Sequence, residues 1–101
     1  MLTSKQRAFL RKEAQVLDPV FQIGKGGITD EVVTAVHNAL SARELIKLKT
    51  LETCPYTSKE AARILAEATH SDSVQVIGSK FVLFRKKDKD SKFDLKHLVT
   101  L

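Results

Sequence analysis

The sequence of this 101-residue chain contains one cysteine, two prolines, four glycines and no tryptophan. The lone thiol, Cys54, cannot form an internal disulfide, and neither a second cysteine nor closely spaced histidines supply the ligand spacing of a metal site. We therefore predict an inert thiol, no bound metal and no cofactor.

Long hydrophobic runs are also missing. The N-terminus has no continuous apolar stretch of the kind found in a signal peptide, and no segment approaches the roughly 20 apolar residues that span a bilayer. These absences predict a cytoplasmic protein that does not associate with a membrane.

The sequence lacks the motifs of several enzyme classes. No phosphate-binding G-x-x-x-x-G-K-[ST] motif is present, and the position three after Gly26 is Thr29 rather than the third glycine of a dinucleotide fingerprint. The histidines, His37, His70 and His97, are scattered along the chain. We therefore predict that the protein is not an enzyme.

What the sequence does contain is positive charge, unevenly placed. The net charge is +5 with a pI near 9.5. Residues 1–28 carry five Lys/Arg against two acids, a net of +3, residues 29–78 carry a net of −2, and residues 79–101 carry a net of +4. If the two ends meet in space they form one basic face, which would suit a nucleic acid.

Capping signals and periodicity predict the order of elements. Capping boxes at Thr3 with Gln6 and at Thr57 with Glu60, and an N-cap at Thr29, open three helices. We expect helices near residues 3–15, 30–42 and 58–69, and strands near 20–23, 45–51, 73–78 and 80–86. This is a single compact α/β domain of order α-β-α-β-α-β-β over residues 1–86, with helices packed on a four-stranded mixed sheet. Residues 87–101 form a charged, then apolar, extension that is either flexible or folded back on the domain.

The candidate functional segment is the loop Gly24-Lys25-Gly26-Gly27, between an apolar strand and a helix start. Glycine allows a ligand to approach the backbone closely, and a helix N-terminus offers unpaired N–H groups to a phosphate. Lys25 adds a mobile positive charge. The alternative is a tight turn with a solvated lysine.

Further basic residues could extend this site, and we expect the basic side chains of the first helix to share a face with the glycine loop. Asp30 and Glu31 would then belong on the solvent side of the turn. Beyond the loop, the candidate RNA-binding residues are Lys5, Arg7, Arg11, Lys12, Lys80 and Arg85.

Four stretches of this chain resemble the YhbY family of bacterial RNA-binding proteins, the stand-alone form of the CRM (chloroplast RNA splicing and ribosome maturation) domain. They are LTSKQRAFLR from Leu2, LDPVFQIGKGGIT from Leu17, ELIKLK from Glu44 and VQVIGSKFVLFR from Val74. The resemblance implies a fold similar to the C-terminal domain of translation initiation factor three, and a Gly-x-x-Gly loop analogous to that of KH domains. It also implies association with precursors of the large ribosomal subunit. The segment 87–101 is longer and more apolar than the family's ending.

Few aromatic residues remain for stacking on bases, because Phe21, Phe81 and Phe84 lie in apolar strands and are predicted core. We therefore expect recognition of the RNA backbone without sequence reading. The resemblance implies that the RNA is ribosomal, and we expect a monomer without a small-molecule cofactor. The competing hypothesis is a protein-interaction module whose basic surface only steers association.

Overall fold

The structure is a computed structural model that describes residues 2–87. The predicted order of elements is confirmed, and each boundary falls within about two residues of its expected place. The helices are α1 (Ser4–Ala14), α2 (Asp30–Arg43) and α3 (Ser58–Thr69), and the strands are β1 (Pro19–Ile23), β2 (Leu45–Thr50), β3 (Asp72–Ile77) and β4 (Lys80–Phe84). Residues 88–101 lie outside the described range, so the prediction of a separate C-terminal extension is untested.

The three predicted helix starts are present. The Thr3 side chain accepts a hydrogen bond from the Gln6 N–H, and the Gln6 side chain accepts one from the Thr3 N–H. Thr57 and Glu60 form the same reciprocal box at α3, and the Thr29 hydroxyl caps α2. Because each cap satisfies backbone donors that the first turn leaves free, the helices begin where the sequence signals lie.

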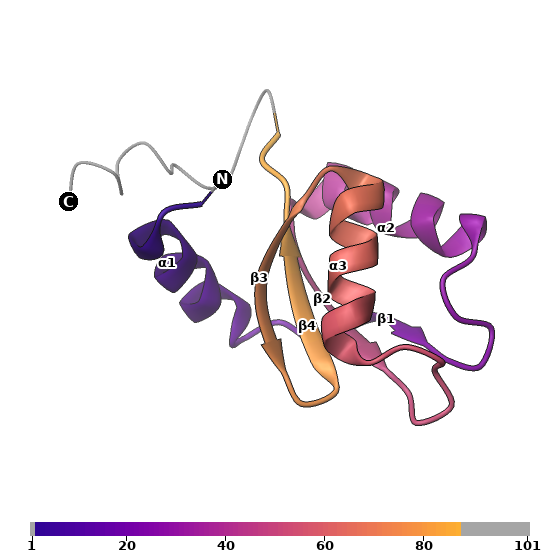
Figure 1. Ribbon diagram of the computed structural model, residues 1–101. Helices are drawn as coiled ribbons and strands as arrows, with labels where there is room; N and C mark the ends of the chain where they lie inside the picture. The colour runs from indigo at the N-terminus through magenta and orange to yellow at the C-terminus, as the bar shows by residue number, and fades with distance from the viewer. Residues whose placement is uncertain (1, 88–101) are drawn as a thin grey trace.

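The sheet has the strand order β1-β2-β4-β3. β1 and β2 are parallel, and β4 lies antiparallel between β2 and β3. Helices α2 and α3 cover one face of the sheet, and α1 covers part of the other (Figure 1). The domain therefore has three layers.

Alternating strand residues supply two cores, one on each face. Between the sheet and α2 and α3, Ile46, Leu48 and Phe81 are fully buried. Between the sheet and α1, Leu10 of the helix packs with Phe84 and other strand residues. Phe81 and Phe84 are thus core residues, as expected, and the partly buried Phe21 packs against the first cluster.

Candidate nucleic-acid interface

The glycine loop is a tight turn closed by its own backbone. The Gly27 N–H donates to the Gly24 carbonyl oxygen over 3.0 Å. Gly27 has a φ of +68°, a left-handed conformation that side chains disfavour, whereas Gly24 and Gly26 do not have positive φ. The turn places Lys25 and Gly26 at its tip.

The three glycines have different surroundings. A Cβ on Gly27 would lie 3.1 Å from Cγ of Pro55, and a Cβ on Gly24 would lie 3.3 Å from Cδ1 of Leu51. A Cβ on Gly26 would meet nothing within 4 Å. Gly27 is therefore required by its positive φ and its close packing, and Gly24 lies against a leucine side chain. Of the three, Gly26 alone leaves the backbone open to an approaching ligand.

A second loop braces the first. The Leu51 N–H donates to the Ile23 carbonyl over 2.9 Å, so residues 51–56 run beside the glycine turn. Thr50 ties this end of the sheet together, because its hydroxyl lies 2.7 Å from Ser58 Oγ in α3 and 3.3 Å from the Ser79 carbonyl in the β3–β4 turn. Hydrogen bonds to neighbouring segments therefore hold the end of the sheet from which the glycine loop extends.

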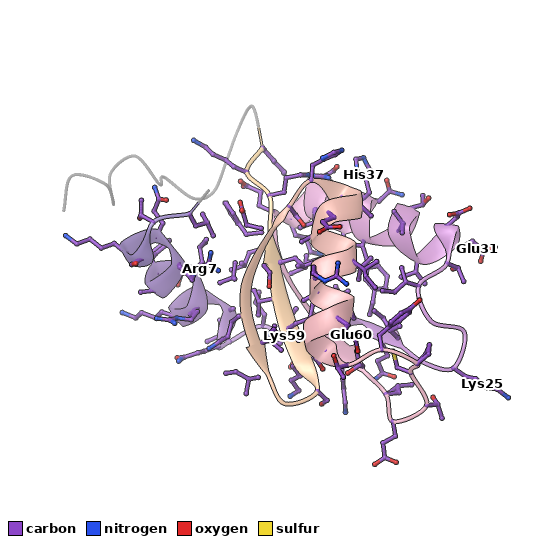
Figure 2. The ribbon with its side chains drawn as sticks, viewed as in Figure 1. Arg7, Lys25, Glu31, His37, Lys59 and Glu60 are labelled. Atoms are coloured by element: carbon purple, nitrogen blue, oxygen red, sulfur yellow. The ribbon has the colours of Figure 1, made fainter. Side chains whose placement is uncertain are left out.

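The parallel pairing of β1 and β2 brings two helix N-termini to this end of the sheet, since α2 and α3 each follow one of these strands. Both ends carry partial positive charge from the helix dipole. Lys25 is exposed at the outer corner of the domain, as Figure 2 shows, and makes no ion pair within the described residues. Asp30 and Glu31 are exposed, as expected.

The prediction that the basic side chains of α1 share a face with the glycine loop is wrong for Arg7. Arg7 of α1 donates through its guanidinium to the carbonyl oxygens of Ser73 and Val74 in β3. β3 and β1 are the opposite edges of the sheet, and Arg7 and Lys25 stand far apart in Figure 2. Arg7 therefore braces an edge strand instead of extending the patch around Lys25.

Packing explains the position of α1. Helices α2 and α3 occupy one face of the sheet, so the apolar stripe of α1, with Leu10 and Ala14, covers the other. Three exposed basic residues also lie on α1, namely Lys5, Arg11 and Lys12. They belong to the α1 side of the domain, away from the layer formed by α2 and α3.

The two candidate residues of the final strand region lie at opposite ends of β4. Lys80 is exposed beside the β3–β4 turn, at the same end of the sheet as the glycine loop. Arg85 donates to the carbonyls of Thr69 over 2.7 Å and His37 over 3.0 Å, and to Ser41 Oγ over 2.8 Å. These bonds tie α2 and α3 together, which assigns Arg85 a structural role.

Sequence reasoning missed one residue beside the loop, Tyr56, and one at the same end of the sheet, Lys59. Lys59 is exposed in the first turn of α3, and the Tyr56 ring lies against Gly27, its Cε2 atom 3.4 Å from where a Cβ would stand. The capping box at Thr57 placed Lys59 in a first turn, but only the strand pairing shows that this turn lies at the same end as the loop. Beside Lys59, the backbone hydrogen bond from Thr57 lowers the pKa of the Glu60 carboxyl, aided by the Thr57 side chain.

Residues 2–87 contain neither a metal-binding cluster nor a membrane-spanning helix. No group of three or more histidine, cysteine, aspartate or glutamate side chains within that range could hold a metal ion. None of the helices there is long and apolar enough to cross a membrane.

The structure thus defines a small α/β domain that presents a lysine on a tight glycine turn beside two helix N-termini. The CRS1 / YhbY (CRM) domain family model matches residues 2–85, and the chain belongs to this family.

Several relatives cover nearly the whole chain. The Bacillus subtilis protein named Probable RNA-binding protein YqeI is 40% identical over 95 residues, covering 94% of this chain and 99% of its own length. An RNA-binding protein of Haemophilus influenzae is 34% identical, covering 87% and 89% of the two chains. The solution structure of a Staphylococcus aureus protein, described as a candidate RNA-binding protein, has a TM-score of 0.78 at 44% identity and covers 93% of this chain and 98% of that one.

Proposed function

We propose that this protein binds ribosomal RNA in precursors of the large ribosomal subunit and acts in ribosome assembly, as a cytoplasmic monomer that needs no small-molecule cofactor and catalyses no reaction. The observation that carries the proposal is the exposed Lys25 on a braced glycine turn, in a family whose members are named RNA-binding proteins.

The proposed contact is with the sugar-phosphate backbone. Lys25 supplies a mobile charge, and the open space over Gly26 lets a phosphate approach the main chain. Lys59 and the N-termini of α2 and α3 lie at the same end of the sheet, where the exposed acids Asp30, Glu31 and Glu60 in the first turns oppose their positive potential. Tyr56 is the one exposed aromatic side chain within residues 2–87, so recognition rests on backbone and shape more than on stacked bases.

The competing hypothesis, a protein-interaction module, is based on an exposed apolar side chain in a surface groove. Val16 is 85% exposed and lines a groove of about 730 Å³ between the end of α1 and strands β1 and β2. An apolar partner segment could lie there, with the basic charge only steering the encounter.

A titration separates the two hypotheses. Precursor large-subunit ribosomal RNA, transcribed in vitro, is titrated with the protein at several salt concentrations. The RNA-binding hypothesis predicts saturable binding whose log K falls steeply with log salt, because bound lysines release counterions. Absence of binding at low salt would favour the protein module. Crosslinking in cells, followed by sequencing of the attached RNA, then tests whether the bound RNA is ribosomal.

A further inference from the structure

The α1 side of the sheet is only partly covered. Helix α1 packs on Leu45, Val74, Val82 and Phe84, toward one end of the strands. The strand residues that share this face but lie nearer the glycine loop are polar or exposed. They are Gln22 of β1, Lys47 and Lys49 of β2, Gln75 and Ile77 of β3, and Lys80 of β4.

Three lysines gather in this uncovered region. The register pairs Lys49 directly with Lys80, and Lys47 lies two residues before Lys49 on the same face. A groove of about 230 Å³ has Lys47 and Lys80 on one side and Ala14 and Gln15, at the end of α1, on the other. We call Lys47, Lys49 and Lys80 the sheet-face lysines.

The hydrogen-bond pattern brings two of these lysines especially close. The N–H groups of Thr50 and Arg85 donate to the carbonyls of Ser79 and Glu44, so these positions are hydrogen-bonded pairs of the β2–β4 ladder. Since hydrogen-bonded and non-hydrogen-bonded pairs alternate, Lys49 and Lys80 form a non-hydrogen-bonded pair, in which side chains are closer. Like charges directly opposite one another in a sheet are destabilising.

None of the sheet-face lysines has a carboxylate within 4.0 Å among residues 2–87, where Arg63 pairs with Glu67 on α3. Glu13 and Asp18 line the same larger groove as Lys47 but form no ion pair with it. A cluster of cations that the fold itself does not neutralise is complementary to a polyanion.

The sheet-face lysines adjoin the proposed RNA site. Gln22 pairs with Lys49, and one residue separates Gln22 from Gly24. Because a strand advances about 3.3 Å per residue, the lysine pair and the glycine turn lie within the reach of a few nucleotides. A single RNA strand or one side of a duplex could therefore touch both.

We propose that the sheet-face lysines form a second phosphate-contacting site, which holds the RNA backbone as it continues from the glycine loop across the open half of the sheet. This inference rests on the proposed function. The side-chain amides of Gln22 and Gln75 flank the lysines and can donate to phosphate or ribose oxygens. None of the six residues that make up this region is aromatic, so the contact is with the backbone and not with stacked bases.

The test compares two double variants that remove the same charge. Lys49→Gln with Lys80→Gln acts on the sheet face. Arg63→Gln with Lys86→Gln removes two exposed charges, one from the outer surface of α3 and one beyond the far end of β4. Both variants and the wild type are titrated with precursor large-subunit ribosomal RNA over a salt series and, separately, with polyglutamate, and all are melted thermally.

The sheet-face variant is expected to bind at least about tenfold more weakly than the wild type, and to flatten the salt slope by about 1.4–1.8 units for two lost contacts. Its melting temperature should be unchanged or raised, because the substitutions relieve repulsion. The control variant should keep most of both the affinity and the slope.

Three outcomes overturn the inference in different ways. If the wild type binds this RNA and the two variants behave alike, the second site is wrong while the proposed function stands. If the wild type does not bind the RNA, the proposed function fails and the inference fails with it. If the sheet-face variant loses binding to polyglutamate but not to the RNA, the lysines serve an acidic protein partner instead.

Discussion

Gly27 and Gly26 are neighbours, but the structure predicts opposite consequences of adding a methyl group to them. Gly27→Ala would force a non-glycine residue to a φ of +68°, which costs roughly 1–2 kcal/mol. Its Cβ would also press on Cγ of Pro55 at 3.1 Å, closer than the roughly 3.5–4.0 Å of an ordinary carbon contact. A gain of about 0.4–1 kcal/mol from the less flexible unfolded chain offsets part of this.

The cost of the positive φ and this gain leave a net loss of about 0–1.6 kcal/mol for Gly27→Ala, and the contact with Pro55 adds to it. We therefore expect a loss of roughly 1 kcal/mol or more, or a melting temperature lower by at least about 4–8 °C for a domain of this size. Gly26→Ala is the matched control, since it meets nothing within 4 Å and needs no positive φ. It should leave the free energy of unfolding unchanged or raise it by up to about 1 kcal/mol. Urea unfolding followed by circular dichroism measures both. Equal midpoints for the two variants would refute the assigned turn geometry.

The remaining predictions concern bracing, boundaries and pH. Arg7→Ala should lower the free energy of unfolding by about 1–2 kcal/mol, because it removes a charged donor from two β3 carbonyls. Arg11→Ala, at an exposed position of the same helix, should leave it unchanged. Equal urea midpoints for the two variants would show that Arg7 does not stabilise the edge strand. Truncation after Lys87 should leave a domain that unfolds cooperatively near the full-length midpoint, and a broad transition in its melting curve would place the C-terminal segment in the core. Because the pKa of Glu60 is lowered on folding, its capping contribution is fully present above the ordinary carboxylate pKa and is lost as the pH falls through the folded value. The free energy of unfolding of the wild type, measured in urea, should therefore fall between about pH 5 and pH 3, and the fall should be smaller in Glu60→Gln. Identical pH profiles for the two proteins would contradict a capping role for Glu60.

Much of the fold was predictable because its signals are local. The capping boxes at Thr3 and Thr57 involve residues three apart, so the sequence alone located the helix starts. The alternation of Ile46 and Leu48 with two lysines likewise indicated a strand with different faces. From these elements the order of helices and strands in the domain could be inferred.

The placement of basic side chains was less predictable, because it depends on contacts between distant segments. The roles of Arg7 and Arg85 are set by carbonyls that lie 66 and 16 residues away. Glu44, fully buried with a φ of +66°, receives the Arg85 N–H at its carbonyl and the Lys87 N–H at its carboxylate over 3.1 Å. Nothing in the local sequence indicated a buried acid there.

The glycine loop was found from its sequence, but the roles of its glycines were not. All three seemed equally suited to give a ligand clearance. The structure assigns Gly24 and Gly27 to packing against residues 51–56, a loop brought near by the pairing of β1 with β2. The same pairing brings Tyr56 beside the turn, which no spacing of residues in the sequence indicated.

The most direct test of the account is the affinity of Lys25→Glu for precursor large-subunit ribosomal RNA, measured over a salt series beside Lys86→Glu, a matched reversal at another exposed lysine. The account predicts normal folding for both variants, a loss of about tenfold or more for Lys25→Glu, and a salt slope flatter by about one unit. The Lys86 variant should retain most of the wild-type affinity. If Lys25→Glu folds normally and binds the RNA as tightly as the wild type, the glycine loop is only a turn and the RNA-binding site lies elsewhere.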